Sequence, residues 1–173
     1  MIKITGYNIE QLIYKGLHST FYRATRISDN IKVIVKVLNS EYPTLEELEN
    51  IKREYRITNK PYGDKVIKVY GIENYKNSIC IILEDFGAIS LSELINTRKI
   101  DLNKKLSIAA DIADAVWSIH KQGVIHKDVN PYNIVINFET NELKIIDFGI
   151  STDLYSEKLQ YMSKLEGTCL YMP

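Results

Sequence analysis

Two short segments in the second half of the chain hold residue types that can handle phosphate groups. The first is a largely polar loop from His126 to Asn133 that contains Asp128, and the second is Asp147-Phe148-Gly149. A carboxylate can orient an attacking hydroxyl, and carboxylate and amide oxygens are the hard ligands that Mg²⁺ prefers. Asp128, Asn133 and Asp147 could therefore provide the positioning and the metal ligands that phosphoryl transfer requires.

The elements that must position these residues are predicted from the apolar pattern. Before residue 87, five short runs rich in β-branched and aromatic residues predict strands at 7–15, 20–27, 32–38, 66–72 and 79–83. A helix is predicted at 44–59, because Pro43 and Thr44 open it and Glu46 and Glu47 lie in its first turn. The first half is therefore expected to be a mostly antiparallel sheet with one helix.

After residue 88 the apolar period becomes helical. A long helix is predicted at 103–122 and ends before Gly123, which can adopt the left-handed conformation of a helix stop. Its predicted apolar positions are Leu106, Ala109, Ala110, Ala113, Val116 and Trp117. Two short strands at 134–137 and 143–146 are expected to form a hairpin between the two polar segments.

Composition excludes several classes of protein. The 22 Lys and Arg residues balance 22 Asp and Glu residues, so no overall charge favours nucleic acid or an anionic membrane as a partner. No apolar run approaches the ~20 residues of a membrane span. Cys80 and Cys169 lie far apart in the sequence, which argues against a zinc site or a disulfide framework. A globular, cytoplasmic protein is expected.

The two polar segments resemble those of a Hanks-type, eukaryotic-like serine/threonine protein kinase. His126-Lys127-Asp128 with Asn133 is similar to the catalytic-loop pattern H-R-D-x-x-x-x-N, and Asp147-Phe148-Gly149 matches D-F-G. The resemblance implies an α+β, two-lobed kinase fold, with an N-lobe at 1–87 and part of a C-lobe at 88–173. It also implies ATP and Mg²⁺ as cofactors, with Asn133 and Asp147 as metal ligands and Asp128 as the residue that orients the acceptor hydroxyl.

A third match lies on the predicted strand at 32–38. Val33-Ile34-Val35-Lys36 resembles the V-A-I-K strand, whose lysine binds the α- and β-phosphates of ATP. Glu54 lies on the helix where the family places the ion partner of that lysine. From the residues alone, Lys36 could instead extend its ammonium into water, and Glu47 could compete with Glu54.

Two further segments are implied to bind the nucleotide. Tyr14, Gly16 and Ser19 fall at the three glycine positions of the phosphate-covering loop G-x-G-x-x-G, so this loop is expected to be stiff and bulky; alone, it would be interpreted as a hairpin turn. The segment at 81–87 resembles the hinge, in which the Glu84 carbonyl and the Phe86 amide would bind the edge of the base.

The end of the chain resembles an activation segment. In Glu166-Gly167-Thr168-Cys169-Leu170-Tyr171-Met172, Thr168 is expected to contact Asp128. The hydroxyl residues before it are candidates for phosphorylation: Ser151, Thr152, Tyr155, Ser156, Tyr161 and Ser163. Because the resemblance stops at Pro173, before the family's A-P-E motif, we expect a truncated kinase with little activity alone and an exposed far side of the long helix.

Two departures from the family pattern qualify the expected activity. Lys127 replaces an arginine that can hold a phosphorylated loop, which argues against activation by loop phosphorylation. Asn130 stands where a lysine usually meets the γ-phosphate, so slower transfer is expected. The segments at 126–133 and 147–151 together resemble the kinase module of large bacterial proteins that also carry ATPase and sensor histidine kinase regions, in which both departures would be ordinary. This resemblance implies further signalling domains in a longer parent protein.

Three functions remain open from the sequence. The first is transfer of phosphate from ATP to serine or threonine of a protein substrate. The second is a small-molecule phosphotransferase of the same fold, against which Gly167-Thr168 and Tyr171 argue. The third is a pseudokinase-like binding module, favoured by the glycine-poor loop and by Asn130 but not by Lys36, Asp128 and Asp147.

Overall fold

The computed structural model describes residues 2–155 and 167–171. The chain divides into two compact units, one made of residues 1–55 and 68–86 and the other of residues 56–67 and 87–173. Each unit has its own core. Within residues 2–155 and 167–171, the helices lack the combination of length and hydrophobicity that a membrane span requires.

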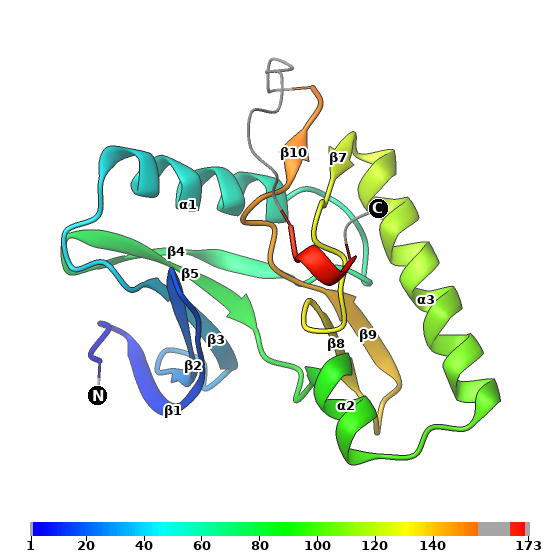
Figure 1. Cartoon of the computed structure of the whole chain (residues 1–173). Coiled ribbons are helices and arrows are strands. Elements are labelled where there is room, and N and C mark those ends of the chain that lie inside the picture. Colours follow the sequence, from blue (N-terminus) through cyan, green and yellow to red (C-terminus); the bar gives the residue numbers. More distant parts are fainter. Residues whose placement is uncertain (1, 156–166, 172–173) are drawn as a thin grey trace. The chain divides into compact units, whose positions relative to one another are not determined.

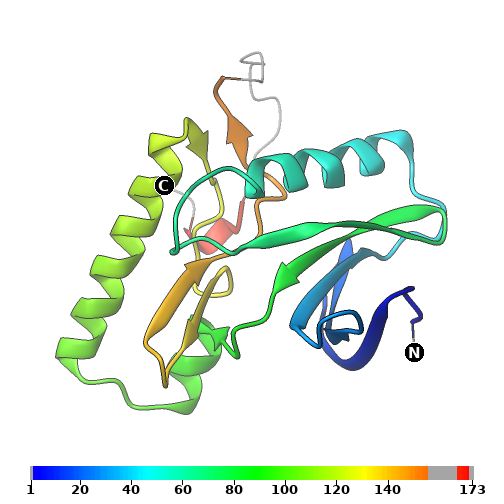
Figure 2. The ribbon, with the colours of Figure 1, turned by 180° about the vertical axis from the view of Figure 1, so that it is seen from behind.

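The first unit is built on one antiparallel sheet (Figure 1). Its strands are β1 (Tyr7–Lys15), β2 (Ser19–Arg26), β3 (Lys32–Leu38), β4 (Val69–Tyr75) and β5 (Ser78–Glu84), in the spatial order β1-β2-β3-β5-β4. Helix α1 (Leu45–Thr58) connects β3 to β4, and Figure 2 shows it from behind along the sheet. The predicted five-stranded antiparallel sheet with one helix is confirmed.

The helix begins as the sequence predicts. The Glu47 backbone N–H donates to the Thr44 hydroxyl at 3.1 Å, and the Thr44 N–H donates to the Glu47 carboxylate at 2.8 Å. This reciprocal pair is a capping box, which satisfies two of the free N–H groups at a helix start. Glu47 is therefore engaged at the end of α1 far from Glu54.

Alternation along the strands gives the sheet two different faces. One face packs an apolar core with these buried residues: Ile4, Ile9, Ala24, Val33, Val35, Val37, Cys80 and Ile82. The opposite face carries Ile81, which packs against Ile51 of α1 and Val69. Because side chains alternate, Lys36 lies on this second face, between two buried valines of the first.

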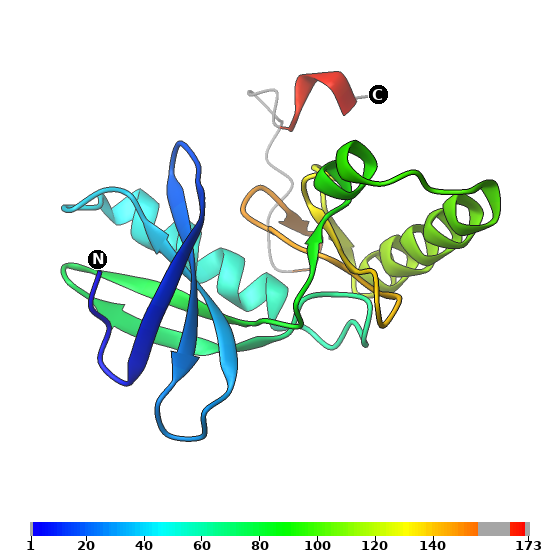
Figure 3. The same ribbon diagram turned by 90° about the horizontal axis from the view of Figure 1, so that it is seen from below.

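The second unit packs helices against a small sheet. It contains β6 (Ile89–Ser90), α2 (Leu91–Thr97), α3 (Leu102–Lys121), β7 (Val124–Ile125), β8 (Ile134–Asn137), β9 (Glu142–Ile145), β10 (Thr152–Asp153) and the 3₁₀ turn η1 (Cys169–Tyr171). Strands β6, β8 and β9 form one antiparallel sheet, and β10 pairs with β7. Figure 3 shows α2 and α3 beside this sheet.

The predicted apolar face of α3 is largely not the buried one. Ile108, Ala115 and Ile119 are buried, whereas Leu106 and Trp117 are 60% and 68% exposed. A spacing of three and four residues identifies a helix, but apolar residues on more than one side of this helix have that spacing. Packing against the neighbouring strands determines which side is buried. The exposure of Leu106 and Trp117 agrees with the expectation for the far side of this helix.

The fourth strand begins three residues later than predicted. Val66 and Ile67 instead belong to the second unit, where Val66 forms a parallel bridge with Ile145 and the Ile67 N–H donates to the Ile145 carbonyl at 3.0 Å. The apolar run that begins at Val66 therefore serves two sheets in succession, and a single predicted strand could not represent it.

Candidate active site

Lys36 and Glu54 form a buried ion pair inside the first unit. The Lys36 ammonium donates to the Glu54 carboxylate at 2.5 Å, and the two side chains are 6% and 10% exposed. Strand β3 and helix α1 supply the two residues. The contact predicted between them is present, and the alternative in which Lys36 extends into water is wrong. Such a held ammonium is suited to bind phosphate oxygens.

The turn between β1 and β2 is compact. The Gly16 N–H donates to the Ser19 carbonyl at 2.9 Å, and the Asn39 side-chain amide donates to the Gly16 and Leu17 carbonyls at 2.8 and 3.0 Å. A Cβ at Gly16 would meet the Tyr14 ring at 3.0 Å. This is the hairpin turn that the bare sequence suggests, and Asn39 and Tyr14 explain the expected stiffness. The phosphate-binding roles of Gly16 and Ser19 stay a prediction.

The end of β5 is held by Lys68, the residue just before β4. The Glu84 N–H donates to the Lys68 carbonyl at 3.0 Å, and the Glu84 carboxylate accepts from the Lys68 N–H at 2.6 Å. Phe86 is the last residue of the first unit, two residues beyond this point. The implied base-binding carbonyl and amide thus lie on a segment whose start is fixed by the sheet.

In the second unit, a hairpin brings Asn133 next to the start of Asp147-Phe148-Gly149. Strands β8 and β9 pair Ile134 with Ile145, and the Ile146 N–H donates to the Asn133 carbonyl at 2.9 Å. Asn133 and Asp147 therefore leave the same end of the hairpin. Asp147 has a φ of 64°, in the left-handed region that non-glycine residues rarely adopt.

Asp128 accepts hydrogen bonds from two of the predicted site residues. Its Oδ2 accepts from Asn133 Nδ2 at 2.7 Å, and its Oδ1 accepts from the Thr168 hydroxyl at 2.7 Å and the Thr168 N–H at 3.0 Å. The predicted contact between Thr168 and Asp128 is therefore present. These bonds fix the plane of the carboxylate, which is what a group that orients a substrate hydroxyl needs.

Asn130 has a role that the sequence reasoning missed. It is 3% exposed, and its Oδ1 accepts from the backbone N–H groups of Tyr132 at 2.8 Å and Asn133 at 3.2 Å. Its amide nitrogen donates to the Thr168 hydroxyl at 3.1 Å. Asparagine has a known preference for such turns, so its identity within a polar loop was the available signal.

His126 connects the catalytic loop to the Asp147 segment. Its Nε2 donates to the Ile146 carbonyl at 3.1 Å, and its Nδ1 accepts from the Asp128 N–H at 3.3 Å. Burial lowers the pKa of His126, which favours the neutral ring that this pair of bonds requires. The ring also makes an edge contact at 4.7 Å between centroids with Phe148, which is fully buried.

The segment after Gly149 is fixed at several points. The Ser151 hydroxyl is fully buried and donates to the His126 carbonyl at 3.1 Å, so in this conformation it is shielded from a modifying enzyme. Asp153 forms an ion pair with Lys60 at 2.9 Å. Tyr155 is 81% exposed. The candidates Ser156, Tyr161 and Ser163 lie outside the described residues, as do Glu166, Met172 and Pro173.

The donor set suits a magnesium ion. Because Asn133 donates through Nδ2 to Asp128, the other branch of its amide, Oδ1, is the atom that can bind a metal. Asp147 offers a carboxylate from the same end of the hairpin. Hard oxygen ligands of this kind match the preference of Mg²⁺, which keeps several waters and also binds substrate phosphates.

Comparisons with known proteins agree with these motifs. A family model described as the protein kinase domain matches residues 7–173. A probable serine/threonine-protein kinase of Clostridium acetobutylicum is 30% identical over 96% of this chain and 25% of its own length.

Two further relatives have names that describe different specificities. The dual specificity protein kinase Ttk of Danio rerio is 31% identical over 99% of this chain and 18% of its own length. The serine/threonine-protein kinase PrkC of Bacillus subtilis is 25% identical over 98% and 26%. The chain thus spans about a quarter or less of the length of these relatives. The matched family model and the geometry of both units lead to one conclusion, that the chain belongs to the Hanks-type protein kinase family.

Proposed function

We propose that this chain transfers the γ-phosphoryl group of ATP to serine or threonine hydroxyls of a protein substrate. The observation that carries this proposal is the Asp128 carboxylate, whose two oxygens are oriented by Asn133 and Thr168. The names of relatives such as the Bacillus subtilis kinase support serine and threonine as acceptors.

Each site residue has a defined task in this proposal. Asp128 orients the acceptor hydroxyl and accepts its proton as the oxygen attacks the γ-phosphorus. Lys36, held by Glu54, binds phosphate oxygens of ATP. Asn133 and Asp147 would hold Mg²⁺, which when bound neutralises charge on the phosphates. Gly16 and Ser19 cover the phosphates, and the backbone of Glu84 and Phe86 receives the base.

Thr168 is proposed to help select the acceptor. Its hydroxyl donates to Asp128 at 2.7 Å and accepts from Asn130 at 3.1 Å, so it lies directly beside the catalytic carboxylate. A side chain at this place limits the approach of the acceptor to the oxygen of Asp128. This contact favours a protein kinase over a small-molecule phosphotransferase, in agreement with the sequence around Gly167.

The test is a transfer assay with the 173-residue chain. ATP labelled in its γ-phosphoryl group is supplied with Mg²⁺ and a peptide library that contains serine and threonine. Because Asn130 stands where a lysine usually meets the γ-phosphate, we expect slow but measurable formation of labelled phosphoserine or phosphothreonine. No labelled product is expected when an aminoglycoside replaces the peptides. Asp147→Ala should abolish the Mg²⁺ dependence of ATP binding.

The same assay separates the alternatives. ATP binding that depends on Mg²⁺ without any transfer would indicate a non-catalytic binding module. Transfer to the aminoglycoside alone would indicate a small-molecule phosphotransferase. Absence of ATP binding by the unaltered chain would overturn all nucleotide-dependent functions.

A further inference from the structure

A second group of charged residues lies on the Lys36 face of the sheet in the first unit. Strands β2 and β3 pair Phe21 with Lys36, Arg23 with Ile34 and Thr25 with Lys32. Directly paired residues of an antiparallel sheet lie on the same face. The ammonium of Lys36 lies 5.3 Å from the centre of the Phe21 ring, which confirms this for the first pair. Arg23 lies on β2 two residues beyond Phe21, the partner of Lys36, so Arg23 and Lys36 lie on the same face of the sheet.

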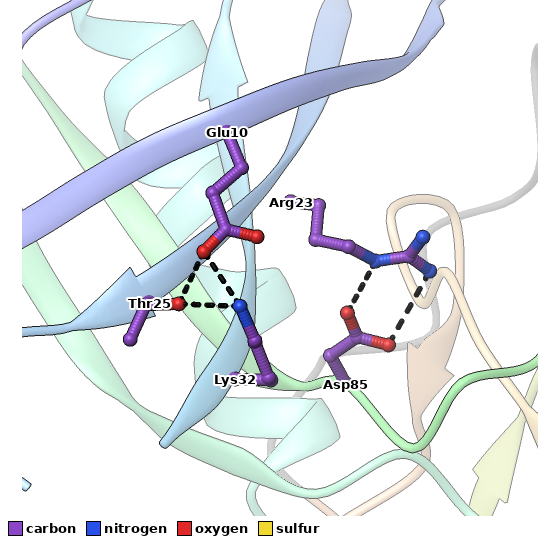
Figure 4. Close-up of polar contacts among 5 residues, drawn as sticks. All are labelled: Glu10, Arg23, Thr25, Lys32 and Asp85. Atoms are coloured by element: carbon purple, nitrogen blue, oxygen red, sulfur yellow. Dashed lines mark hydrogen bonds and ion pairs between the residues drawn. The ribbon is translucent and has the colours of Figure 1, made fainter. Parts of the chain in front are cut away.

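Arg23 makes a two-point ion pair with Asp85, the residue that follows β5 (Figure 4). Arg23 Nε donates to Asp85 Oδ2 at 2.5 Å, and Nη2 donates to Oδ1 at 3.4 Å. The Asp85 side chain is 6% exposed and the Arg23 side chain is 33% exposed. A guanidinium that contacts both oxygens of a shielded carboxylate restricts its orientation more than a single contact does.

The position of Asp85 in the chain gives this pair its importance. It lies between Glu84 and Phe86, whose backbone groups are proposed to bind the base. Glu84 is fastened to Lys68 just before β4 by two hydrogen bonds, while Asp85 is fastened to Arg23 of β2. The segment is therefore held from two different parts of the sheet, which restricts rotation of the peptide groups between Glu84 and Phe86.

A neighbouring cluster on the same face offers a matched control. Glu10 of β1 accepts hydrogen bonds from the Thr25 hydroxyl and from the Lys32 ammonium, the latter at 2.6 Å (Figure 4). Glu10 is the extra residue of a bulge in β1, since Ile9 pairs with Ala24 and Gln11 with Arg23. This cluster links β1, β2 and β3 and includes none of residues 84–86.

We propose that Arg23 is a positioning residue for the nucleotide base. Its ion pair with Asp85 holds the peptide groups of residues 84–86 in the orientation that receives the edge of a purine. This inference rests on the proposed function, because the base is a part of ATP. It assigns Arg23 no contact with the phosphates, which are the task of Lys36.

The test compares a ligand that has a base with one that has none. Dissociation constants for Mg²⁺-ATP and for Mg²⁺-tripolyphosphate are measured with the unaltered chain, Arg23→Met and Lys32→Met. Arg23→Met retains an apolar stem and removes the guanidinium. We expect it to weaken ATP binding about five- to tenfold and to leave tripolyphosphate binding unchanged, with kcat unchanged at saturating ATP. Lys32→Met should change neither constant.

Two more variants protect the test against a folding defect. Asp85→Asn removes the charge from the other partner and should weaken ATP binding in the same selective way. The exchanged pair Arg23→Asp with Asp85→Arg should recover most of the lost ATP affinity. Urea unfolding of each variant confirms that the chains compared are folded.

The outcomes are distinct. Equal ATP affinity for Arg23→Met and the unaltered chain overturns the inference alone. A parallel loss for ATP and tripolyphosphate overturns it too, because the ion pair then supports only the fold of the unit. If the unaltered chain binds tripolyphosphate but shows no added affinity for ATP, the proposed use of the base fails, and this inference with it.

Discussion

The two units hold their functional side chains by different means. In the first unit, one buried ion pair between a strand and a helix fixes Lys36. In the second, Asp128 is fixed by several hydrogen bonds from loop residues, and Lys127 and Asp147 nearby adopt positive φ values of 68° and 64°. The position of the ammonium therefore depends on the packing of its whole unit, while the position of the carboxylate depends on the conformation of a loop.

The largest effect should come from removing the charge of Asp128. Asp128→Asn leaves an oxygen that can accept from Thr168 but removes the base that orients and deprotonates the acceptor. We expect a fall in kcat of about 10³-fold, within the range for loss of a general base. Phosphoryl transfer at saturating ATP measures it, and urea unfolding should show a small change in stability.

Asp114→Asn is the control for this variant, because the Asp114 side chain is 73% exposed on α3 in the same unit. Its kcat should match that of the unaltered chain. A collapse of the folded state in Asp128→Asn would contradict the idea that the carboxylate is coupled mainly to activity.

The second effect concerns stability. Lys36→Met deprives the buried Glu54 carboxylate of its ammonium, and loss of one partner of a buried pair costs about 3–5 kcal/mol in the free energy of unfolding. Urea denaturation measures this value. Lys32→Met breaks the solvent-exposed pair with Glu10, which water and salt screen, and should therefore lower the free energy of unfolding much less. Equal costs would show that burial does not distinguish these two pairs.

A third change sharpens the role of Asn130. Asn130→Lys introduces the residue that the family pattern favours, but it removes the oxygen that accepts from the Tyr132 and Asn133 N–H groups. We expect a loss of about 1–3 kcal/mol in unfolding free energy and no gain in kcat. Asn103→Lys, on the exposed start of α3, is the control. A faster and equally stable Asn130→Lys variant would mean that the missing charge matters more than the turn.

The smallest effect is a pH dependence in the first unit. Burial raises the pKa of the Cys80 thiol to about 11, above its ordinary value of 9.0. As pH rises, the folded state therefore retains the thiol proton to a higher pH than the unfolded state does. The contribution of Cys80 to the stability of the fold is complete below pH 9 and is lost as pH rises toward 11. The titration of this one thiol changes the free energy of unfolding by at most about 1.4 kcal/mol per pH unit.

Stability measured by urea at pH 8 to 11 should therefore fall more steeply in the unaltered chain than in Cys80→Ala. Cys169→Ala, at an exposed thiol in the second unit, should retain the full slope. The same slope in Cys80→Ala would assign the dependence to other groups.

The sequence predicts regular elements better than it predicts their partners. Runs rich in β-branched and aromatic residues locate β1 and β3 to the residue, and the helix signals locate α1 and α3 within one residue at each end. Helix α2 was missed although Ser90 caps it by accepting from the Glu93 N–H, a Ser-x-x-Glu signal that was readable. Strands β6, β7 and β10 have two residues each, too few to show a period.

In the candidate site, too, the residues that match known motifs could be predicted, whereas contacts made by loop folding or by strand order could not. Motif spacing was sufficient to name Lys36 with Glu54 and Asp128 with Thr168, because these residues match patterns whose partners are known. Asn130 and the link from His126 to Ile146 depend on how a loop folds back on itself, which no periodic pattern encodes. Arg23 and Asp85 are far apart in sequence and meet only because β2 and the end of β5 flank β3.

The passage of residues 56–67 through the second unit has a practical consequence for dissecting the protein. A gene fragment cut at a single point near residue 87 would carry Ile57, Tyr62 and Val66 away from the core in which they are buried. The remaining fragment would lack the bridge that Val66 makes with Ile145. Neither half should therefore be obtained as a well-behaved recombinant product by simple truncation, and a circularly permuted or co-expressed design would be required.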